Sequence, residues 1–522
     1  MAQGPSSSAA SYLIPLNEGV SFTSILTAGD AVGVKFEPTS QRGEAWRMVG
    51  TPDGLGAYDN GNGTMTVLMN HELEANEGTV RAHGATGAFV SELIVDKRSL
   101  EVLGGQDLIR ELYTWNSETS SYVLSQDAMD RLCSADLPAP TAFFNPATNK
   151  GYAEGRIFLN GEESGVDGRA FAHFASGPDA GQSFELPALG QFSHENQVAN
   201  PHAMDETVVI GLDDSTPGQV YVYIGDKQTE GTALERAGLS GGQLFGIAVE
   251  GAALESRETG FGADEVDFSL VPVSDAAAES GQALEQASDA QGVTEFLRPE
   301  DGAWDPLVAN RFYFVTTDRF DENKPGADNP DAVPFPEEPS RPPGVPTEQE
   351  QPQDIGRSRL WQLDFNDLSD PASGGTLTML LDGTEAHQML DNMTVNDDGI
   401  IVLQEDPGNV GYSAKIWQYD PNLDELTVLA QHDPALFGSA GSTDALLTVN
   451  EESSGVIDVS DILGGRGEHV YLLDVQAHFN NEREIDEGGQ LLAMSVDGTV
   501  GMNSSSVGAA AASANTDTIL IA

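Results

Sequence analysis

Residues 64–72 read Thr-Met-Thr-Val-Leu-Met-Asn-His-Glu, an apolar run that ends in an imidazole and a carboxylate. The run has the length and the β-branched character of a strand. The same kind of ending recurs along the chain, where short apolar segments lead into acidic or imidazole side chains. These endings are Asn160-Gly161-Glu162-Glu163, Ser193-His194-Glu195, Gln404-Glu405-Asp406, Asn450-Glu451-Glu452 and Gln476-Ala477-His478.

Most of the chain consists of such strand-length apolar segments, each followed closely by a Gly, Asp or Asn turn. Long amphipathic helices are few, and the candidates are residues 276–290 and 125–133. Many short strands over 522 residues without a clear linker predict an all-β protein, a single large β-propeller of six or seven blades. We expect residues 1–20 to be a mature N-terminal segment, and residues 21–522 to form the propeller with a few helical and Pro-rich insertions. The main insertion is expected at about 322–356, where Pro and acidic residues exclude a central strand.

The composition is strongly acidic, with 24 Lys+Arg against 83 Asp+Glu and a formal net charge of −59. This charge argues against nucleic acid or an anionic membrane surface as a partner. No stretch approaches the roughly 18 apolar residues of a membrane span. The charge indicates either adaptation to a saline medium or an ordinary acidic secreted protein, and we expect a secreted or periplasmic location. Cys133 is the only cysteine, so an intrachain disulfide is excluded, and we expect its thiol to be inert.

The repeated strand endings predict a metal centre. Equivalent strand ends of a propeller converge at one mouth of the central channel, and convergent carboxylates repel one another unless cations lie between them. Each residue taken alone also fits a structural role, such as a buried histidine or a strand-end charge. Five of the nine histidines nevertheless lie in or beside these segments, namely His71, His194, His202, His387 and His478. Imidazole with carboxylate suits Mn, Fe, Zn or Co, and oxygen ligands alone suit Ca, Mg or Mn.

The motifs together resemble a known family. Val67–Glu72, Phe192–Asn196, Arg298–Asp301, and Asp391–Met393 with Gln404–Asp406 are similar to the PhoX-like alkaline phosphatases, which are metal-dependent β-propellers. That family has a cysteine in a Cys-Glu-Glu segment among its iron and calcium ligands, whereas Leu159–Glu163 has none. The His-containing motifs also resemble the related propeller phosphotriesterases (haloalkylphosphorus hydrolases), whose binuclear centre is built from Glu and His.

The resemblance implies a metal-dependent hydrolase of small phosphoric esters that uses a metal-activated water. It implies two transition-metal ions, with Mn preferred to Fe or Zn, and Ca as an addition. It also implies a set of metal ligands, with Glu72, Glu162 and Glu195 the less direct matches: Glu72, Glu162, Glu163, His194, Glu195, His387, Glu405 and His478.

Arg298 is the candidate catalytic residue, because a guanidinium fork matches phosphoryl oxygens. Its alternative role is a salt bridge to Glu300 or Asp301. Two other functions stay open at this point. One is a non-catalytic, calcium-stabilised propeller that binds or scaffolds a partner. The other is a lactonase-like propeller with one calcium ion, against which the number of histidines argues. The oligomeric state is equally open.

Overall fold

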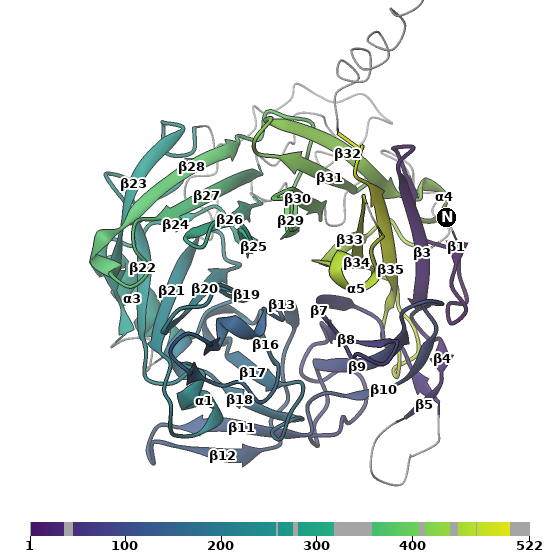
Figure 1. The fold of residues 1–522 in the computed structure, drawn as a ribbon, viewed down its shortest axis with the longest axis horizontal. Coiled ribbons are helices and arrows are strands. Elements are labelled where there is room, and N and C mark those ends of the chain that lie inside the picture. Colours follow the sequence, from purple (N-terminus) through teal and green to yellow (C-terminus); the bar gives the residue numbers. More distant parts are fainter. Residues whose placement is uncertain are drawn as a thin grey trace, which may run out of the picture.

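The computed structural model describes residues 2–35, 45–256, 259–274, 280–317, 358–406, 413–438, 447–465 and 467–501. These residues form six blades around a central axis (Figure 1). The innermost strand of each blade contacts the innermost strand of the next, and the last contacts the first, so the ring closes. The predicted all-β propeller is confirmed, and the described blades number six.

Each of the first three blades runs from an innermost strand at the channel to strands at the rim. From the channel outward, the first blade contains β7 (Pro52–Asp59), β8 (Thr64–His71), β9 (Phe89–Asp96), β10 (Val102–Asp107) and β5 (Val34–Lys35). The second contains β13 (Leu132–Asp136), β16 (Ile157–Glu162), β17 (Ala170–Phe174), β18 (Gln182–Glu185), β11 (Glu111–Asn116) and β12 (Ser121–Ser125). The third contains β19 (His194–Ala199), β20 (Glu206–Asp213), β21 (Gly218–Asp226), β22 (Gln243–Val249) and β23 (Glu265–Pro272).

The other three blades follow the same plan. The fourth contains β25 (Pro299–Trp304), β26 (Arg311–Thr316), β27 (Arg359–Phe365) and β28 (Gly375–Leu381), and β28 also pairs with β23. The fifth contains β29 (Leu390–Val395), β30 (Ile401–Glu405), β31 (Lys415–Asp420), β32 (Glu425–His432) and β2 (Leu13–Pro15). The sixth contains β33 (Glu451–Asp458), β34 (Glu468–Ala477), β35 (Gly488–Asp497), β3 (Val20–Thr27) and β1 (Ala2–Gln3).

Short elements connect or edge the blades. The short strands are β4 (Ala31–Val32), β6 (Trp46–Arg47), β14 (Phe144–Asn145), β15 (Lys150–Gly151) and β24 (Glu295–Phe296). The α-helices of the described residues are α1 (Ala233–Arg236), α3 (Gly281–Gln291), α4 (Pro434–Phe437) and α5 (Ser460–Leu463). None of these helices is long and apolar enough to cross a membrane.

Both ends of the described chain contribute to ring closure. β3 pairs antiparallel with β35, from Val20 opposite Val496 to Thr27 opposite Gln490. The segment 1–20, which we expected to precede the propeller, supplies two outer strands, because β1 pairs with β3 and β2 pairs with β32. The sixth blade therefore forms only when both ends of the chain fold together.

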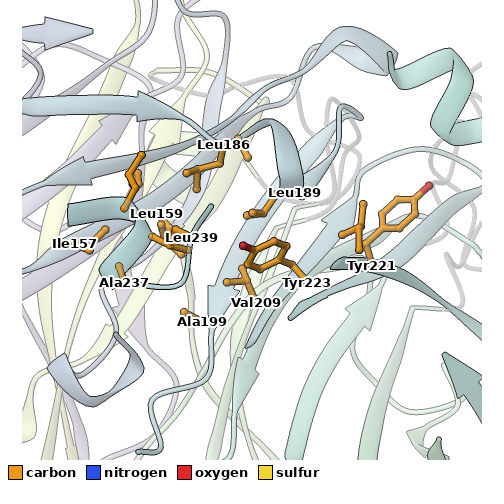
Figure 2. Close-up of a cluster of buried hydrophobic side chains, with 14 of the residues drawn as sticks. Ile157, Leu159, Leu186, Leu189, Ala199, Val209, Tyr221, Tyr223, Ala237 and Leu239 are labelled. Atoms are coloured by element: carbon orange, nitrogen blue, oxygen red, sulfur yellow. The ribbon is translucent and has the colours of Figure 1, made fainter. Parts of the chain in front are cut away.

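The cores lie between neighbouring blades, where strands are apolar on both faces. Figure 2 shows one of them, in which Leu159 of the second blade lies near Val209 and Tyr223 of the third. All three side chains are buried. Burial of apolar surface contributes roughly 25 cal/mol per Å², so these inter-blade layers are the main favourable term that holds the ring together.

The two helix predictions had different outcomes. Helix α3 covers residues 281–290 of the predicted segment 276–290, and residues 276–279 lie outside the described residues. Ser280 is the N-cap of the helix, and its hydroxyl accepts the N–H of Ala283. The prediction of a helix over 125–133 is wrong, because β12 ends at Ser125 and β13 begins at Leu132. Arg131 has a φ of 47°, which ends any right-handed helix at that residue. The predicted insertion at 322–356 lies outside the described residues.

We predict that Phe22→Ala destabilises the protein by about 3–5 kcal/mol. Phe22 is 1% exposed and packs in the core of the closing blade with Tyr471 and Met494. Urea unfolding followed by tryptophan fluorescence measures the change. The matched control is Leu423→Ala, because Leu423 is 60% exposed and should change stability little. Equal effects of the two variants would contradict closure by this core.

The carboxylic acid at the end of the innermost strand of the second blade, Asp136, makes the free energy of unfolding depend on pH. Asp136 of β13 lines a cavity of about 210 Å³ beside Asn196 and Asp301, and accepts the Ala199 N–H at 2.7 Å. Burial raises the pKa of Asp136 to about 7. The folded protein therefore keeps this proton up to about pH 7, whereas the unfolded chain releases it near pH 4. The stabilisation from this bound proton is therefore complete below about pH 4, and it is lost as the pH rises from about 4 to about 7.

We therefore predict that Asp136→Asn, which keeps the acceptor for Ala199, flattens the decline in melting temperature between pH 5 and pH 8. Differential scanning calorimetry at both pH values gives the comparison with the wild type. An unchanged difference between the two pH values would mean that Asp136 is ionised in the folded protein throughout this range.

Candidate metal centre

The second residue of every innermost strand carries a potential metal ligand. We call these residues the inner ring: Asp53, Cys133, Glu195, Glu300, Asp391 and Glu452. All are buried except Glu452, which is partly exposed. Five of the six are carboxylic acids, and one comes from each blade.

A second ring of residues lies at the end of the channel where the innermost strands begin. In each blade the second strand runs antiparallel to the innermost strand and therefore ends where the innermost strand begins. The residue that follows the second strand donates its N–H to the carbonyl of the residue that precedes the innermost strand, at 2.8–3.1 Å in all six blades. We call these donors the mouth ring: Glu72, Glu163, Asp214, Thr317, Asp406 and His478.

The backbone is irregular at this level in every blade. Each innermost strand has one extra residue relative to its partner, at or just after the inner-ring position. Such β-bulges re-aim side chains and are common beside active sites. Four of the six residues that precede the innermost strands also have left-handed φ angles, namely Thr51 (44°), Arg131 (47°), Arg298 (61°) and Met389 (42°). Left-handed non-glycine residues cost of order 1–3 kcal/mol each and concentrate at functional sites.

Two groups of ligand atoms form where the rings meet. Asp53, Glu72 and Cys133 of the first and second blades offer donor atoms within 4.8 Å of one another. Glu195, Asp214 and Glu300 of the third and fourth blades do the same. A further acidic group lies away from the channel, on α3 and β24: Glu285, Asp289 and Glu295.

Polar contacts join the rings across blades. The Gln476 amide donates to Asp53 Oδ2 at 3.1 Å and to Glu72 Oε2 at 2.8 Å. The Cys133 thiol lies 3.5 Å from Asp53 Oδ2. The Ser134 hydroxyl donates to Glu195 Oε1 at 2.7 Å. These contacts hold the carboxylates in fixed positions around the channel.

Without a bound cation, several inner-ring carboxylic acids favour their protonated, neutral form. Burial first, and repulsion by neighbouring carboxylates second, raise the pKa values of Asp53 and Glu300 well above the usual range and that of Glu195 to about 8. The same causes raise the pKa of the Cys133 thiol. Among the described residues, none donates a well-directed hydrogen bond to either oxygen of Glu300, although Arg298 Nε lies 2.6 Å from Oε1. The same part of the chain offers no hydrogen-bond partner to the carboxylate oxygens of the fully buried Asp474 of β34.

Three cationic side chains partly compensate this charge. Arg131 bridges Glu72 and Glu163, and Arg298 pairs with Asp214 and Glu300. Burial lowers the pKa of His478, but hydrogen bonds to Glu452 and Glu487 outweigh this and raise it to about 11. The inner ring contains five carboxylic acids and the mouth ring four, so nine acids face these three described cations.

The structure brings half of the predicted ligands together. Glu195 is in the inner ring, and Glu72, Glu163 and His478 are in the mouth ring. His478 is held there as a cation between Glu452 and Glu487, at 3.5 Å and 2.6 Å.

The other predicted ligands lie outside the rings. Glu162 forms a two-armed ion pair with Arg169. Glu405 accepts the indole N–H of Trp417 at 2.8 Å. His194 Nδ1 lies 2.7 Å from the Gln197 amide, with its ring against Phe192.

The reason for three of these displacements is alternation, because consecutive strand residues point to opposite faces of a sheet. Glu162, Glu405 and His194 each directly precede a ring residue. His387 is buried elsewhere, with Nε2 2.8 Å from the Ser358 carbonyl.

Arg298, the predicted phosphoryl clamp, has a side chain that is only 11% exposed and is paired with Asp214 and with Glu300, the second of which is the alternative role stated for it. Cys133, predicted to be inert, lies among the ring carboxylates. Other ring members were absent from the predicted set: Asp53, Asp214, Glu300, Asp391, Asp406 and Glu452. A usable signal existed for several of them, because the motifs Arg298–Asp301, Asp391–Met393 and Gln404–Asp406 already contain them.

Comparison with solved structures identifies the fold. The structure of Pseudomonas fluorescens PhoX in complex with vanadate, a transition-state analogue, matches with a TM-score of 0.62 at 11% identity, over 94% of this chain and 97% of that chain. A putative 6-phosphogluconolactonase from Bacteroides uniformis matches at a TM-score of 0.32 and 11% identity, over 76% and 94% of the two chains. A Synechocystis apocarotenoid oxygenase variant matches at 0.34 and 10%, over 83% and 89%.

Comparison by sequence agrees with the first of these. No curated protein matches the chain. The model of the family described as alkaline phosphatase PhoX matches residues 178–415, which include the third and fourth blades and their whole group of Glu195, Asp214 and Glu300. The resemblance to the PhoX-like family is thus confirmed, because the chain has the PhoX fold over nearly its whole length and the sequence pattern of the PhoX family over residues 178–415.

Proposed function

We propose that this protein is a metal-dependent hydrolase of phosphoric esters whose metal centre is formed by the inner and mouth rings. The observation that supports the proposal is the convergence of carboxylic acids from all six blades, nine in the two rings, beside only three described cationic side chains. Buried like charges are strongly unfavourable unless they are protonated or bind cations. The match of residues 178–415 to the PhoX family and the shared fold indicate the phosphoester class.

The ring residues fit bound metal ions. Glu300 of the inner ring and Asp474 of β34, which lies outside the rings, have buried carboxylate oxygens to which the described residues donate no well-directed hydrogen bond, and buried polar atoms in folded proteins are rarely left so. Each of the two ligand groups offers three donor atoms within 4.8 Å, which leaves further coordination positions for water or substrate. The groups take their members from different blades, so each ion would also join neighbouring blades.

The two groups favour different metals. Asp53, Glu72 and Cys133 include a thiol, and a thiolate selects transition metals over calcium. Glu195, Asp214 and Glu300 offer only carboxylates, which suit Mn, Mg or Ca. The expectation of imidazole ligands has less support, because His194 and His387 lie outside the rings. We therefore propose one transition-metal ion in the first group, and Mn or Ca in the second.

Bound metal ions would supply a Lewis acid for the phosphoryl oxygens and lower the pKa of a bound water. The chain's own residues position these groups. Gln476 fixes Asp53 relative to Glu72, and Ser134 orients Glu195. Arg298 partly neutralises Asp214 and Glu300, which limits the repulsion that the second ligand group must overcome.

We also propose that the protein works in a saline medium outside the cytoplasm. The excess of 83 acidic over 24 basic residues supports this setting, because carboxylates keep a surface hydrated and dissolved salt screens their repulsion. The same charge weakens encounter with dianionic monoesters at low salt. A substrate panel should therefore include monoesters, diesters and neutral triesters.

We predict that Cys133→Ser and Glu195→Gln each remove about one of roughly two bound metal ions and lower phosphoester hydrolysis by at least about 100-fold. Elemental analysis of protein purified without chelator gives the metal content, and the ester panel gives the activity. Glu285→Gln is the matched control, because Glu285 belongs to the acidic group outside the channel.

A loss of metal in the Glu285 variant alone would place the metal outside the rings and contradict the proposal. Calcium without hydrolysis of any ester would instead favour a calcium-stabilised binding propeller. Two transition-metal ions with hydrolysis of only one ester class would confirm the reaction and define the substrate.

We predict that the melting temperature rises steadily between 0.1 M and 1 M NaCl, because the Debye length falls from about 10 Å to about 3 Å over that range. Calorimetry in NaCl and in KCl separates screening from binding of a particular cation. A melting temperature that falls with salt would contradict adaptation to a saline medium.

A further inference from the structure

We infer that three buried polar residues outside the rings position the Cys133 thiol for metal binding. They are Asn70 of β8, Asn160 of β16 and His173 of β17, and a chain of hydrogen bonds joins them to the Cys133 carbonyl. The inference rests on the proposed function, in which Cys133 is a ligand of the first group. It assigns the residues that hold this ligand in place.

The chain of hydrogen bonds ends on the backbone that carries the thiol. Asn70 Nδ2 donates to the Cys133 carbonyl at 2.6 Å and lies 3.5 Å from the Ser134 carbonyl. Both residues belong to the bulge of β13, where the backbone is irregular. The amide reaches them across Gly54, because a Cβ at that position would lie 2.7 Å from Asn70 Nδ2. Asn70 therefore fixes the peptide on which the direction of the thiol depends.

The direction of every hydrogen bond in the chain follows from this end. Two carbonyls face the Asn70 amide nitrogen, so Asn70 Oδ1 is the acceptor for Asn160 Nδ2, at 3.0 Å. Asn160 Oδ1 then accepts from His173 Nε2 at 2.7 Å, and His173 Nδ1 accepts the Ser183 hydroxyl at 2.7 Å. Burial lowers the pKa of His173 to about 3, which agrees with a neutral ring that has one donor and one acceptor. All donors in the chain thus point towards Cys133.

The chain is shielded from water over its whole length. Its four side chains, from Ser183 to Asn70, are each 0% exposed. The rings of Phe158 and Phe171 lie beside His173, with centroids 6.2 Å and 6.0 Å from the imidazole. Hydrogen bonds in such surroundings strengthen one another, and a lost partner leaves a buried group unsatisfied. Each side chain is therefore held in one orientation.

The two ligand groups show that this chain accompanies the thiol. Each group takes the inner-ring and mouth-ring residues of one blade and the inner-ring residue of the next: Asp53, Glu72 and Cys133, and Glu195, Asp214 and Glu300. Asn70 precedes Glu72 by two residues. The residue in the equivalent position before Asp214 is Leu212, which is also 0% exposed and has no polar side-chain atom. An amide therefore lies beside the group with a thiol, and an apolar side chain lies beside the group of carboxylates.

Neutral amides reach every member of the first group. Gln476 donates to Asp53 and Glu72 from the sixth blade, and Asn70 donates to the backbone of Cys133 from the first. Amides orient these ligands without adding charge, so the group keeps the negative charge that attracts a cation. Groups that orient metal ligands from outside typically change metal affinity by about 10- to 100-fold when they are removed.

The test uses the thiol itself as the probe, because Cys133 is the only cysteine of the chain. Asn70→Leu copies the leucine of the second group, and His173→Phe removes the donor to Asn160. We expect each variant to weaken cobalt(II) binding by about 10- to 100-fold and to weaken the thiolate-to-cobalt charge-transfer absorption. We also expect the metal-free thiol to react several-fold faster with dithionitrobenzoate, since its peptide is no longer fixed.

Two further variants separate positioning from stability. His173→Gln is the conservative change, because its amide nitrogen can donate to Asn160 in place of Nε2, and we expect it to keep the wild-type cobalt spectrum. His432→Phe is the matched control. His432 is likewise 0% exposed and has a pKa lowered by burial to about 3, but it bonds to Ser453, which belongs to neither ligand group. This variant should lower the melting temperature and leave the thiol unchanged.

The results distinguish this inference from the proposed function. Wild-type cobalt affinity and thiol reactivity in Asn70→Leu and His173→Phe would contradict the inference, and so would equal changes in His432→Phe. A wild-type cobalt complex without thiolate absorption would also contradict it, because Cys133 would then not be a ligand. If Asn70→Leu does not fold, the comparison of His173→Phe with His173→Gln decides. If no ester is hydrolysed but the spectra change as expected, the proposed reaction fails and the positioning role is confirmed.

Discussion

The structure depends on one unfavourable arrangement, the convergence of carboxylates from all six blades on one desolvated channel. Each of these groups would be more stable in water, and together they repel one another. The inter-blade cores must therefore supply the free energy that brings them together. Closure of the ring by β3 and β35 matters for the same reason, because an open ring would let the carboxylates separate.

The backbone makes the arrangement possible at a defined height in the channel. Six hydrogen bonds of 2.8–3.1 Å fix the end of every second strand to the start of the innermost one. A bulge in each innermost strand then lets two successive residues contribute to the channel. Glu195 and Asn196 illustrate this, since Glu195 accepts from Ser134 of one neighbouring blade while Asn196 donates to Asp301 of the other at 2.7 Å. The residues before four of these strands have left-handed φ angles, and this backbone strain accompanies the geometry of the rings.

The fold class was predictable from the sequence because apolar strands and turns alternate throughout. The ends of the second strands were predictable too, since an apolar run that stops at an acid is visible in one dimension, as at Glu72 and Glu163. The inner ring was much harder to predict. Asp53 and Cys133 lie in strands of mixed polarity, and the intervals between ring positions are irregular.

The sequence also could not show which of two adjacent acidic residues faces the channel. Glu162 and Glu163 have the same chemistry, yet one pairs with Arg169 in the blade and the other reaches the mouth. Strand alternation predicts that only one of the two faces the channel, but the bulges shift the phase, and their positions depend on pairing across strands. His387 was misleading for a different reason, because it lies near motif residues in sequence but bonds to Ser358 in space.

The six blades give nearly equivalent positions, so the chemistry of the centre depends on how side chains break that equivalence. Before the innermost strands, the second and fourth blades have Arg131 and Arg298, whereas the fifth and sixth have Met389 and Asn450. The three described cationic side chains at the rings, Arg131, Arg298 and His478, thus belong to the second, fourth and sixth blades. Arg131 contacts Glu72 of the first ligand group, whereas Arg298 contacts Asp214 and Glu300 of the second. A symmetric ring of carboxylates would bind cations equally at every blade, and it is the arginine beside each ligand group that distinguishes these two groups from the rest of the ring.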